Sequence, residues 1–395
     1  MKKKRLASAF LSLVVTAGIM AGCGNQKDAN SSSGSEGGGG NTIKIGANLE
    51  LSGGVASYGR SIAEGVELAF EEINKEGING KELRLVKVDN KSDAAEATNG
   101  AIKLISQDKV TAIIGSATST NTLAQIQVAQ DNKIPLITPT GTNPTITNKG
   151  GKVNEFVFRT CFIDPFQGTV AAKFAINDLK VKKAAVLIDT SSDYSKGLAS
   201  AFKKSFEKDG GKIIAEEAYV AKDTDFRATL TRIKSANPEF IFLPGYYEEV
   251  GLIVKQAREL GINVPIMGGD GWDSPKLVEI AGKEALNNTF ITNHYSSNDP
   301  DPKIQNFVKS FKAKYNKSPD AFNALGYDTA YFLADAIKRA GDVDPEKIKD
   351  ALAKTKDLSL VSGTLTLDKN HDPVKSVTIL EYKDGQQQFK TKVNP

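Results

Sequence analysis

Two stretches rich in hydroxyl side chains follow consecutive predicted strands and have the composition of an anion site. The first stretch, residues 116–120, follows Ile114-Gly115 and precedes a predicted helix, and the second, residues 138–142, follows Ile137. Free N–H groups at a helix start, the positive end of the helix dipole and nearby hydroxyls together bind a carboxylate or a phosphate. A single stretch of this kind is usually only a helix cap. Because the same chemistry follows two consecutive strands, both interpretations stay open, an anion site and a pair of caps.

Acidic and aromatic residues occupy the equivalent positions in the second half of the chain. Tyr194 and Tyr246 each follow a predicted strand, and Asp270 and Trp272 follow a third, in a segment with three glycines. Glycine lets the backbone turn tightly there and expose the Asp270 side chain, although Asp is also a common turn or cap residue. Trp272 lies in a polar loop, which argues against a position in the core. Hydroxyls and amides in one half, with a carboxylate and aromatic rings in the other, suit a zwitterion.

Motifs for catalysis and for metal binding are missing from the sequence. It contains neither a G-x-x-x-x-G-K-[ST] phosphate loop nor a G-x-S-x-G nucleophile elbow. The only histidines are His294 and His371, and Cys161 is the only cysteine after Cys23, so no local spacing supports a zinc site. We therefore expect no catalytic residues, no metal and no cofactor.

The net charge of +4 says little about partners once the N-terminal segment is considered. Four of the 51 basic residues stand at positions 2–5, and the rest of the chain has 47 basic and 47 acidic residues. This balance does not support the basic surface that attracts nucleic acid. We therefore expect no nucleic-acid partner.

The N-terminus has the pattern of an export signal. A basic start and an apolar run that ends at Met20 lead through small residues into Cys23. The run is shorter than the ~20 apolar residues of a comfortable membrane span. The segment resembles the bacterial lipobox, whose cysteine is diacylated, and two acyl chains anchor a protein stably. We expect residues 1–22 to be the signal peptide, residues 23–41 a flexible tether, and the protein to be lipid-anchored through Cys23 on the outer face of the cell membrane. A secreted protein with an incidental cysteine is the alternative.

From Thr42 onward, short apolar runs alternate with helical periods. Residues 43–49 alternate with period two, as a half-buried strand does, and an amphipathic helix follows. This alternation predicts a parallel sheet with helices on both faces. The pattern restarts near Ala184, so we predict an α/β protein of two doubly wound units, followed by a helical segment and a strand tail. Ligands bind at the carboxyl ends of strands in such sheets, so the cleft between the two units is the expected site.

Together these stretches resemble the branched-chain amino acid-binding proteins, the Leu/Ile/Val-type receptors of ABC importers. The resemblance covers nearly all of residues 42–395. It rests on the motifs Leu51-Ser52-Gly53 with Tyr58-Gly59, Glu64-Gly65, Ile114-Gly115, Ile137-Thr138-Pro139, Asp193-Tyr194 and Met267-Gly268. It implies a periplasmic-binding-protein-like fold of type I, in which three crossovers join two lobes. By this likeness lobe 1 comprises residues 42–160 and 294–362, and lobe 2 comprises residues 161–293 and 363–395.

The resemblance also implies a ligand-binding set. With Trp272, which adds bulk nearby, the expected set is Tyr58, Ser119, Thr140, Thr142, Tyr194, Tyr246, Asp270, Trp272 and Phe322. Ser119 and Thr142 would hold the ligand carboxylate, the Thr140 carbonyl and Asp270 would take the ammonium, and the rings would enclose the ligand side chain. Members of the family commonly have Glu where this chain has Asp270, which leaves the identity of the amino acid open.

The predicted function is that of an extracytoplasmic receptor of an ABC importer. It would capture a branched-chain or related L-amino acid in the cleft and deliver it, as a monomer, to a permease in the membrane. The alternatives are a receptor for another small carboxylate or amide, and a sensory ligand-binding protein. An extracellular enzyme is disfavoured, since no nucleophile and base pair is visible in the sequence.

Overall fold

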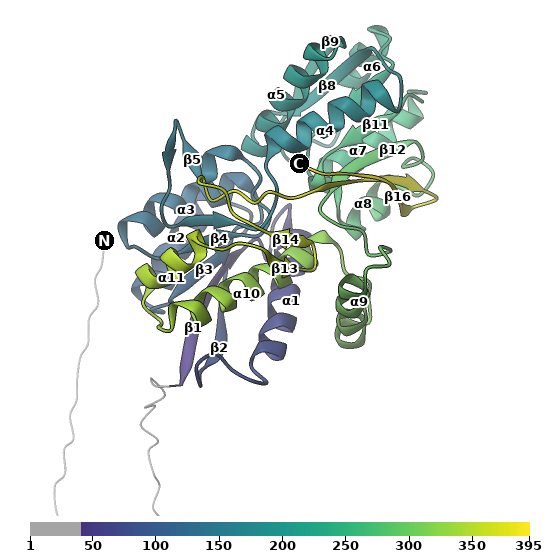
Figure 1. The fold of residues 1–395 in the computed structure, drawn as a ribbon. Coiled ribbons are helices and arrows are strands. Elements are labelled where there is room, and N and C mark those ends of the chain that lie inside the picture. Colours follow the sequence, from purple (N-terminus) through teal and green to yellow (C-terminus); the bar gives the residue numbers. More distant parts are fainter. Residues whose placement is uncertain (1–40) are drawn as a thin grey trace, which may run out of the picture. The chain divides into compact units, whose positions relative to one another are not determined.

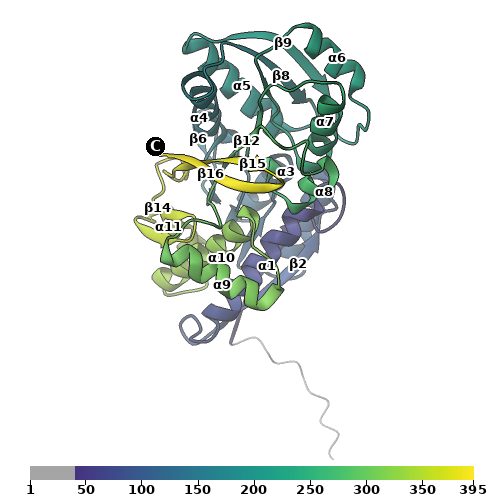
Figure 2. The same cartoon turned by 90° about the vertical axis from the view of Figure 1, so that its right-hand side faces the viewer.

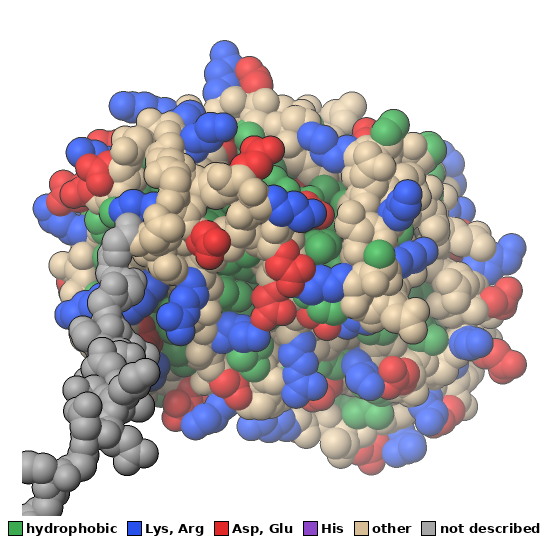
Figure 3. All heavy atoms as spheres, turned by 90° about the horizontal axis from the view of Figure 1, so that it is seen from below, with side chains coloured by type: hydrophobic (Ala, Val, Ile, Leu, Met, Phe, Trp, Pro, Cys, Tyr) green, Lys and Arg blue, Asp and Glu red, His purple; other side chains and the backbone are tan. Residues whose placement is uncertain are grey.

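The computed structural model describes residues 41–395, which build two large β-sheets in separate halves of the molecule (Figure 1) and two small two-stranded ones. A view from a second direction shows the same separation (Figure 2). The predicted signal peptide, the lipidation of Cys23 and nearly all of the predicted tether lie outside the described residues. Within the described part of the chain, no helix is long and apolar enough to span a membrane. On the face seen in Figure 3, basic and acidic side chains are intermingled.

The first sheet has five parallel strands in the order β2-β1-β3-β4-β7. Their bounds are β1 (Thr42–Leu49), β2 (Glu82–Asp89), β3 (Ala112–Gly115), β4 (Leu136–Thr138) and β7 (Val157–Arg159). The helices around it are α1 (Ala56–Ile73), α2 (Ala94–Ser106), α3 (Ser119–Asp131) and α10 (Ala321–Ala340). Alternate residues of a strand face opposite sides of a sheet. Accordingly Ile114 packs in the core that includes α1 and α10, whereas Ile113 packs in the core that includes α2 and α3.

The second sheet has seven strands in the order β16-β15-β12-β11-β10-β8-β9. Their bounds are β8 (Lys183–Asp189), β9 (Lys212–Tyr219), β10 (Phe240–Phe242), β11 (Ile266–Gly268), β12 (Thr289–Asn293), β15 (Val377–Lys383) and β16 (Gln386–Val393). Helices α4 (Asp164–Asn177) and α5 (Asp193–Lys208) pack with Val186 on one face, and α6 (Arg227–Ser235) and α7 (Tyr247–Glu259) pack with Leu187 on the other. The strands from β8 to β12 are parallel, and β15 and β16 are antiparallel.

Short elements complete the fold. They are η1 (Pro144–Ile146), β5 (Asn148–Lys149), β6 (Lys152–Val153), η2 (Asp270–Trp272), α8 (Pro275–Ala281), α9 (Pro302–Tyr315), α11 (Pro345–Ala353), β13 (Leu358–Leu360) and β14 (Gly363–Leu365). The doubly wound α/β architecture predicted from the alternating pattern is confirmed. The antiparallel edge formed by β15 and β16 makes the second sheet mixed rather than purely parallel.

The chain passes between the two sheets three times. The passages follow β7, β12 and the β13–β14 hairpin. Strand β14 of this hairpin ends at Leu365, and the third passage follows it. Lys375 in that passage donates to the Thr160 backbone oxygen in the first passage at 3.1 Å, which ties the two connecting segments together. The lobe boundaries themselves stay a prediction.

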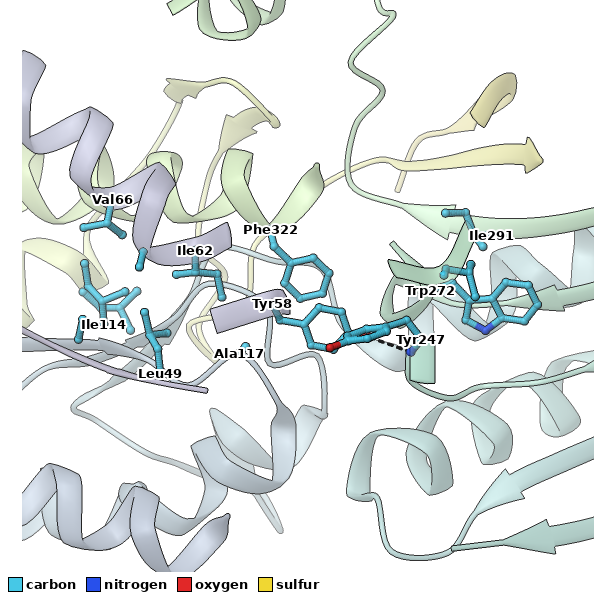
Figure 4. Packing of buried hydrophobic residues seen from close by; sticks show 14 of the residues in the cluster. Leu49, Tyr58, Ile62, Val66, Ile114, Ala117, Tyr247, Trp272, Ile291 and Phe322 are labelled. Carbon is cyan, nitrogen blue, oxygen red and sulfur yellow. Dashed lines mark hydrogen bonds between the residues drawn. The ribbon is translucent and has the colours of Figure 1, made fainter. Parts of the chain in front are cut away.

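Helices α1 and α10 cross at very short range, and this crossing positions two rings of the site. A β-carbon on Gly65 of α1 would lie 2.0 Å from the Asn323 backbone oxygen of α10, so only glycine fits there. Asp320 and Asn323 form a reciprocal capping box that begins α10. As a result Tyr58, near the start of α1, and Phe322, near the start of α10, lie side by side (Figure 4).

Candidate ligand-binding site

A small cavity lies where the carboxyl ends of strands from both sheets come together. Its walls are Tyr58, Ala117, Ser119, Thr140, Tyr194, Tyr246, Asp270, Gly271 and Phe322. Seven of these nine residues belong to the set predicted from the sequence. The free volume of the cavity is only about 10 Å³, far below the roughly 300–1,000 Å³ of typical ligand pockets. The side chains that line the cavity therefore nearly fill it.

A carboxylate of the chain itself occupies the start of α3, where an anion site was one of the two interpretations of the sequence. The buried Glu50 side chain, directly after β1, accepts hydrogen bonds from the Ala117 N–H at 2.9 Å and the Thr118 N–H at 3.1 Å. The Thr118 hydroxyl and the Asn121 amide each donate to it at 2.9 Å. Burial raises the pKa of Glu50, and the backbone donors oppose that rise. The first amides of this loop are therefore not free for a ligand.

Ser119 and Thr140 remain at the cavity with unused hydrogen-bonding capacity. The Ser119 hydroxyl oxygen accepts from the Asn143 N–H at 3.2 Å, so its own hydrogen is available to an acceptor in the cavity. The Thr140 hydroxyl donates to the Ala117 backbone oxygen at 2.6 Å. Among the described residues, the Thr140 backbone oxygen accepts no side-chain hydrogen bond and is therefore open to a donor. One hydroxyl donor and one carbonyl acceptor thus come from the two predicted hydroxyl stretches.

Two residues of the predicted set do not line the cavity. Thr142 is fully buried, its backbone oxygen accepts from the Asp164 N–H at 3.0 Å, and its hydroxyl faces the Asp164 carboxyl without good hydrogen-bond geometry. Trp272 is also fully buried, and its indole N–H donates to the Leu243 backbone oxygen at 2.9 Å. Figure 4 shows its ring beside Ile291, away from the cavity. The expectation that Trp272 avoids the core is wrong, because the tight η2 turn directs it inward and the indole N–H finds a partner there.

Asp270 presents a buried carboxylate to the cavity from η2. Its Oδ1 accepts from the Tyr194 hydroxyl at 3.0 Å, and its Oδ2 lies 3.1 Å from His294 Nε2. Its backbone N–H donates to Gln167 Oε1 at 3.0 Å. The Tyr194 hydroxyl in turn accepts from the Gly271 N–H at 3.1 Å. Groups from two separate segments therefore hold the Asp270 carboxylate, and Gln167 from a third holds its backbone.

Four aromatic rings line the rest of the cavity. Tyr58 and Phe322 stack with centroids 4.1 Å apart, and Tyr194 and Tyr246 stack with centroids 5.2 Å apart. Tyr58 meets Tyr246 edge to face at 5.7 Å. Burial raises the pKa of Tyr58, Tyr194 and Tyr246 well above the usual tyrosine value, so all three hydroxyls stay neutral. One end of the cavity is therefore polar and its walls are aromatic.

Sequence reasoning missed Glu50 and the contact of His294 with Asp270. Glu50 had a usable signal, because it stands directly after a predicted strand, as the hydroxyl stretches do. His294 had none, since it is distant from Asp270 in sequence and only the fold brings them together. Within residues 41–395, no group of three or more His, Cys, Asp or Glu side chains is arranged to hold a metal ion.

Comparisons of the sequence and of the fold with known proteins both point to solute-binding proteins. A family model described as periplasmic binding protein matches residues 42–387. The leucine-, isoleucine-, valine-, threonine-, and alanine-binding protein of Pseudomonas aeruginosa is 33% identical over 332 residues, which are 84% of this chain and 87% of that protein. The branched-chain amino acid transporter substrate binding protein LivJ from Streptococcus pneumoniae, solved in complex with isoleucine, is 40% identical, with a TM-score of 0.85 over 90% of this chain and 100% of that one. An ABC transporter solute binding protein from R. palustris, solved in complex with benzoate, is 27% identical, with a TM-score of 0.82 over 90% of this chain and 97% of that one.

Proposed function

Because this chain belongs to the periplasmic binding protein family, we propose that it is the extracytoplasmic receptor of an ABC importer and that it captures a branched-chain L-amino acid. The observation that carries the proposal is the cavity itself. A buried carboxylate, a hydroxyl donor at a helix start and a carbonyl acceptor converge there between aromatic walls. That arrangement is complementary to a small zwitterion with an apolar side chain.

Ser119 is proposed to bind the ligand carboxylate. It is the first residue of α3, where the helix dipole favours negative charge. Glu50 already engages the amides of Ala117 and Thr118, which leaves the Ser119 hydroxyl as the donor on the cavity wall. Hydrogen bonds to a charged group contribute about 1.5–3 kcal/mol.

Asp270 and the Thr140 carbonyl are proposed to bind the ligand ammonium. Asp270 is buried, and the Tyr194 hydroxyl and the His294 ring donate to its carboxylate. With a neutral His294 ring, neither donor carries a charge that could balance the carboxylate. A buried charge without a counterion is costly, and an ammonium ligand supplies one. This need for a cation favours an amino acid over a simple carboxylic acid.

The aromatic rings are proposed to enclose the ligand side chain. Tyr58, Tyr246 and Phe322 provide flat apolar ring surface against which an aliphatic side chain can pack. The Asp270 side chain is one methylene shorter than the Glu that is common in the family, so its carboxylate ends farther from the expected position of the ligand ammonium. The preferred amino acid therefore need not be the leucine of other members.

Closure of the two halves over the ligand is part of the proposal. Contacts across the cavity include the bond from Ser57 to Ser274, with their hydroxyl oxygens 2.8 Å apart, and the bond from Asn143 Nδ2 to the Asp193 backbone oxygen at 3.0 Å. A ligand that binds better between closed halves shifts the population toward them. We infer that a closed, liganded monomer docks on a membrane permease, and that diacylated Cys23 keeps the receptor at the outer face of the membrane.

A receptor for a small aromatic carboxylate is the second candidate, supported by the benzoate complex of the R. palustris relative. Screening by thermal shift separates the two. Branched-chain amino acids are expected to raise Tm, because ligand at 1,000 times Kd adds ~4.1 kcal/mol of stability. Benzoate and 4-methylpentanoate, which lack an ammonium, are the matched controls and should raise Tm far less. If no L-amino acid raises Tm and a carboxylate does, the amino-acid proposal is wrong.

A further inference from the structure

A buried histidine lies directly behind the carboxylate that faces the cavity. His294, the first residue after β12, places Nε2 3.1 Å from Asp270 Oδ2, and the two side chains are 2% and 5% exposed. The His294 ring stacks on Phe162 with centroids 3.7 Å apart and planes 18° apart. Phe162 belongs to the passage after β7, so two of the three connecting segments hold this ring. His294 does not line the cavity and reaches it only through Asp270.

The hydrogen bonds around His294 decide where its proton lies. An ionised carboxylate can only accept, so the Nε2 atom that contacts Asp270 must carry the hydrogen. In the described structure Nδ1 of the same ring is buried without a hydrogen-bond partner. An unprotonated nitrogen tolerates that environment better than a buried N–H or a second positive charge. The geometry therefore corresponds to a neutral ring that donates through Nε2.

We propose that His294 is a positioning residue for amino-acid recognition, which orients the Asp270 carboxylate toward the ligand ammonium and makes capture of that ammonium dependent on pH. The inference rests on the proposed function. The two donors, Tyr194 on Oδ1 and His294 on Oδ2, each hold one oxygen and so restrict rotation of the carboxylate. A carboxylate held in one orientation loses less rotational freedom when the ligand arrives.

The charge of the His294–Asp270 pair sets the direction of the pH effect. With a neutral ring the pair carries one negative charge, which attracts an ammonium, and with a protonated ring the pair is neutral overall. Burial lowers the pKa of His294, while the bond with Asp270 opposes the shift. The other ionisable groups facing it are Lys375 and Asp273, which are both buried. Asp164 faces Asp270 from α4, and burial raises its pKa to about 8, so it is uncharged in acid. Affinity should therefore fall in acid, as the pH decreases below 6.5 and His294 takes up a proton.

His371 offers a matched control in the same protein. It also stacks on a phenylalanine, Phe158, with centroids 4.3 Å apart, and its Nδ1 lies 3.0 Å from the Val157 backbone oxygen. It contacts no residue of the cavity wall through a hydrogen bond. Replacing it tests the loss of a stacked histidine without touching the Asp270 carboxylate.

The test measures isoleucine affinity by calorimetry between pH 5.5 and 8 for the full mature chain and for His294→Gln and His371→Gln. The wild type and His371→Gln should lose affinity toward pH 5.5, by less than about tenfold, because a single proton competes and the ring takes it up only below its usual range. His294→Gln, whose amide can donate at every pH, should give a nearly flat profile below pH 7, where Asp164 is already protonated. An unchanged slope in His294→Gln would overturn the inference.

Nitrogen NMR of the ligand-free protein gives a second measurement that needs no variant at position 294. The chain has only two histidines, so His371→Gln assigns both ring signals. The inference expects His294 as the Nε2–H tautomer at pH 7.5, and the Nδ1–H tautomer would overturn it. If the wild type binds no amino acid at any pH, the proposed function fails. If it binds an amino acid but His294 has the Nδ1–H tautomer, or His294→Gln keeps the pH dependence of affinity, only the role of His294 is wrong.

Discussion

The Tyr58 hydroxyl in α1 donates a hydrogen bond to the Gly271 backbone oxygen in η2 and thereby joins the two halves across the cavity. The same hydroxyl accepts from the Tyr247 N–H at 3.2 Å. Its ring meanwhile stacks on Phe322 and forms part of the cavity wall. One side chain thus contributes both to the contact between the two halves and to the proposed ligand contact, so we expect it to couple closure to binding.

Replacing Tyr58 by Phe should weaken ligand binding mainly by weakening closure. The ring stack stays, but both hydrogen bonds of the hydroxyl are lost, at a cost of about 1 kcal/mol, so Kd should rise about five- to tenfold. Calorimetry measures the affinity, and small-angle scattering of the ligand-free protein should reveal a more open population. Tyr295→Phe is the control, because it removes a buried hydroxyl that bonds the Pro319 backbone oxygen away from the cavity. Equal Kd values for Tyr58→Phe and the wild type would contradict the coupling.

Replacing Asp270 by Asn should nearly abolish binding of an amino acid. The ammonium would lose its buried counter-charge, at a cost of about 2–5 kcal/mol. The expected increase in Kd is therefore at least about 30-fold, as measured by calorimetry at pH 7.5. Asp273→Asn, three residues away, serves as the control: Asp273 bonds Asn293, Ala321 and Gln387 rather than facing the cavity, so its loss should lower Tm and leave Kd within about threefold.

Replacing Trp272 by Phe should lower stability and leave ligand affinity almost unchanged. The indole is fully buried and its N–H bonds the Leu243 backbone oxygen, so the variant loses a hydrogen bond and packing volume. A loss of about 1–3 kcal/mol in the free energy of unfolding is expected. Urea unfolding followed by circular dichroism measures it, since the variant has no tryptophan left for fluorescence. A large change in Kd without a change in stability would indicate instead that Trp272 contacts the ligand.

Replacing Asp164 by Asn should make the protein less sensitive to alkaline pH. Burial raises the pKa of Asp164 to about 8 from 3.8, so the folded state holds a proton that the unfolded state has released. Stability from this group is therefore full below about pH 4 and declines as the pH rises toward 8. Relative to the wild type, Asp164→Asn should gain a few kcal/mol in the free energy of unfolding between pH 5 and pH 9, in urea titrations. Asp178→Asn, at the exposed end of the same helix, should follow the wild-type slope.

The fold was predictable because its information is local. Period-two spacing in residues 43–49 and helical spacing in α1 record which side of each element is buried, and the alternation of strands with helices leaves few arrangements other than a parallel sheet. The edge strand β16 was less predictable: it is mostly exposed and polar, so hydrophobic patterning does not mark it. Its place beside β15 depends on a tight turn at Asp384-Gly385 and on pairing in space.

The sequence by itself determined the chemistry available at the strand ends, including Ser119, Thr140 and Asp270, because parallel strands bring their carboxyl ends to one edge. Only the tertiary structure decided which of these groups face the cavity. In the folded chain Trp272 packs in the core, Thr142 contacts Asp164, and Glu50 accepts hydrogen bonds from amides at the start of α3. It also brought His294 behind Asp270. Contacts between residues far apart in the chain depend on the angles of turns and on packing between elements, and neither has a periodic signature in the sequence.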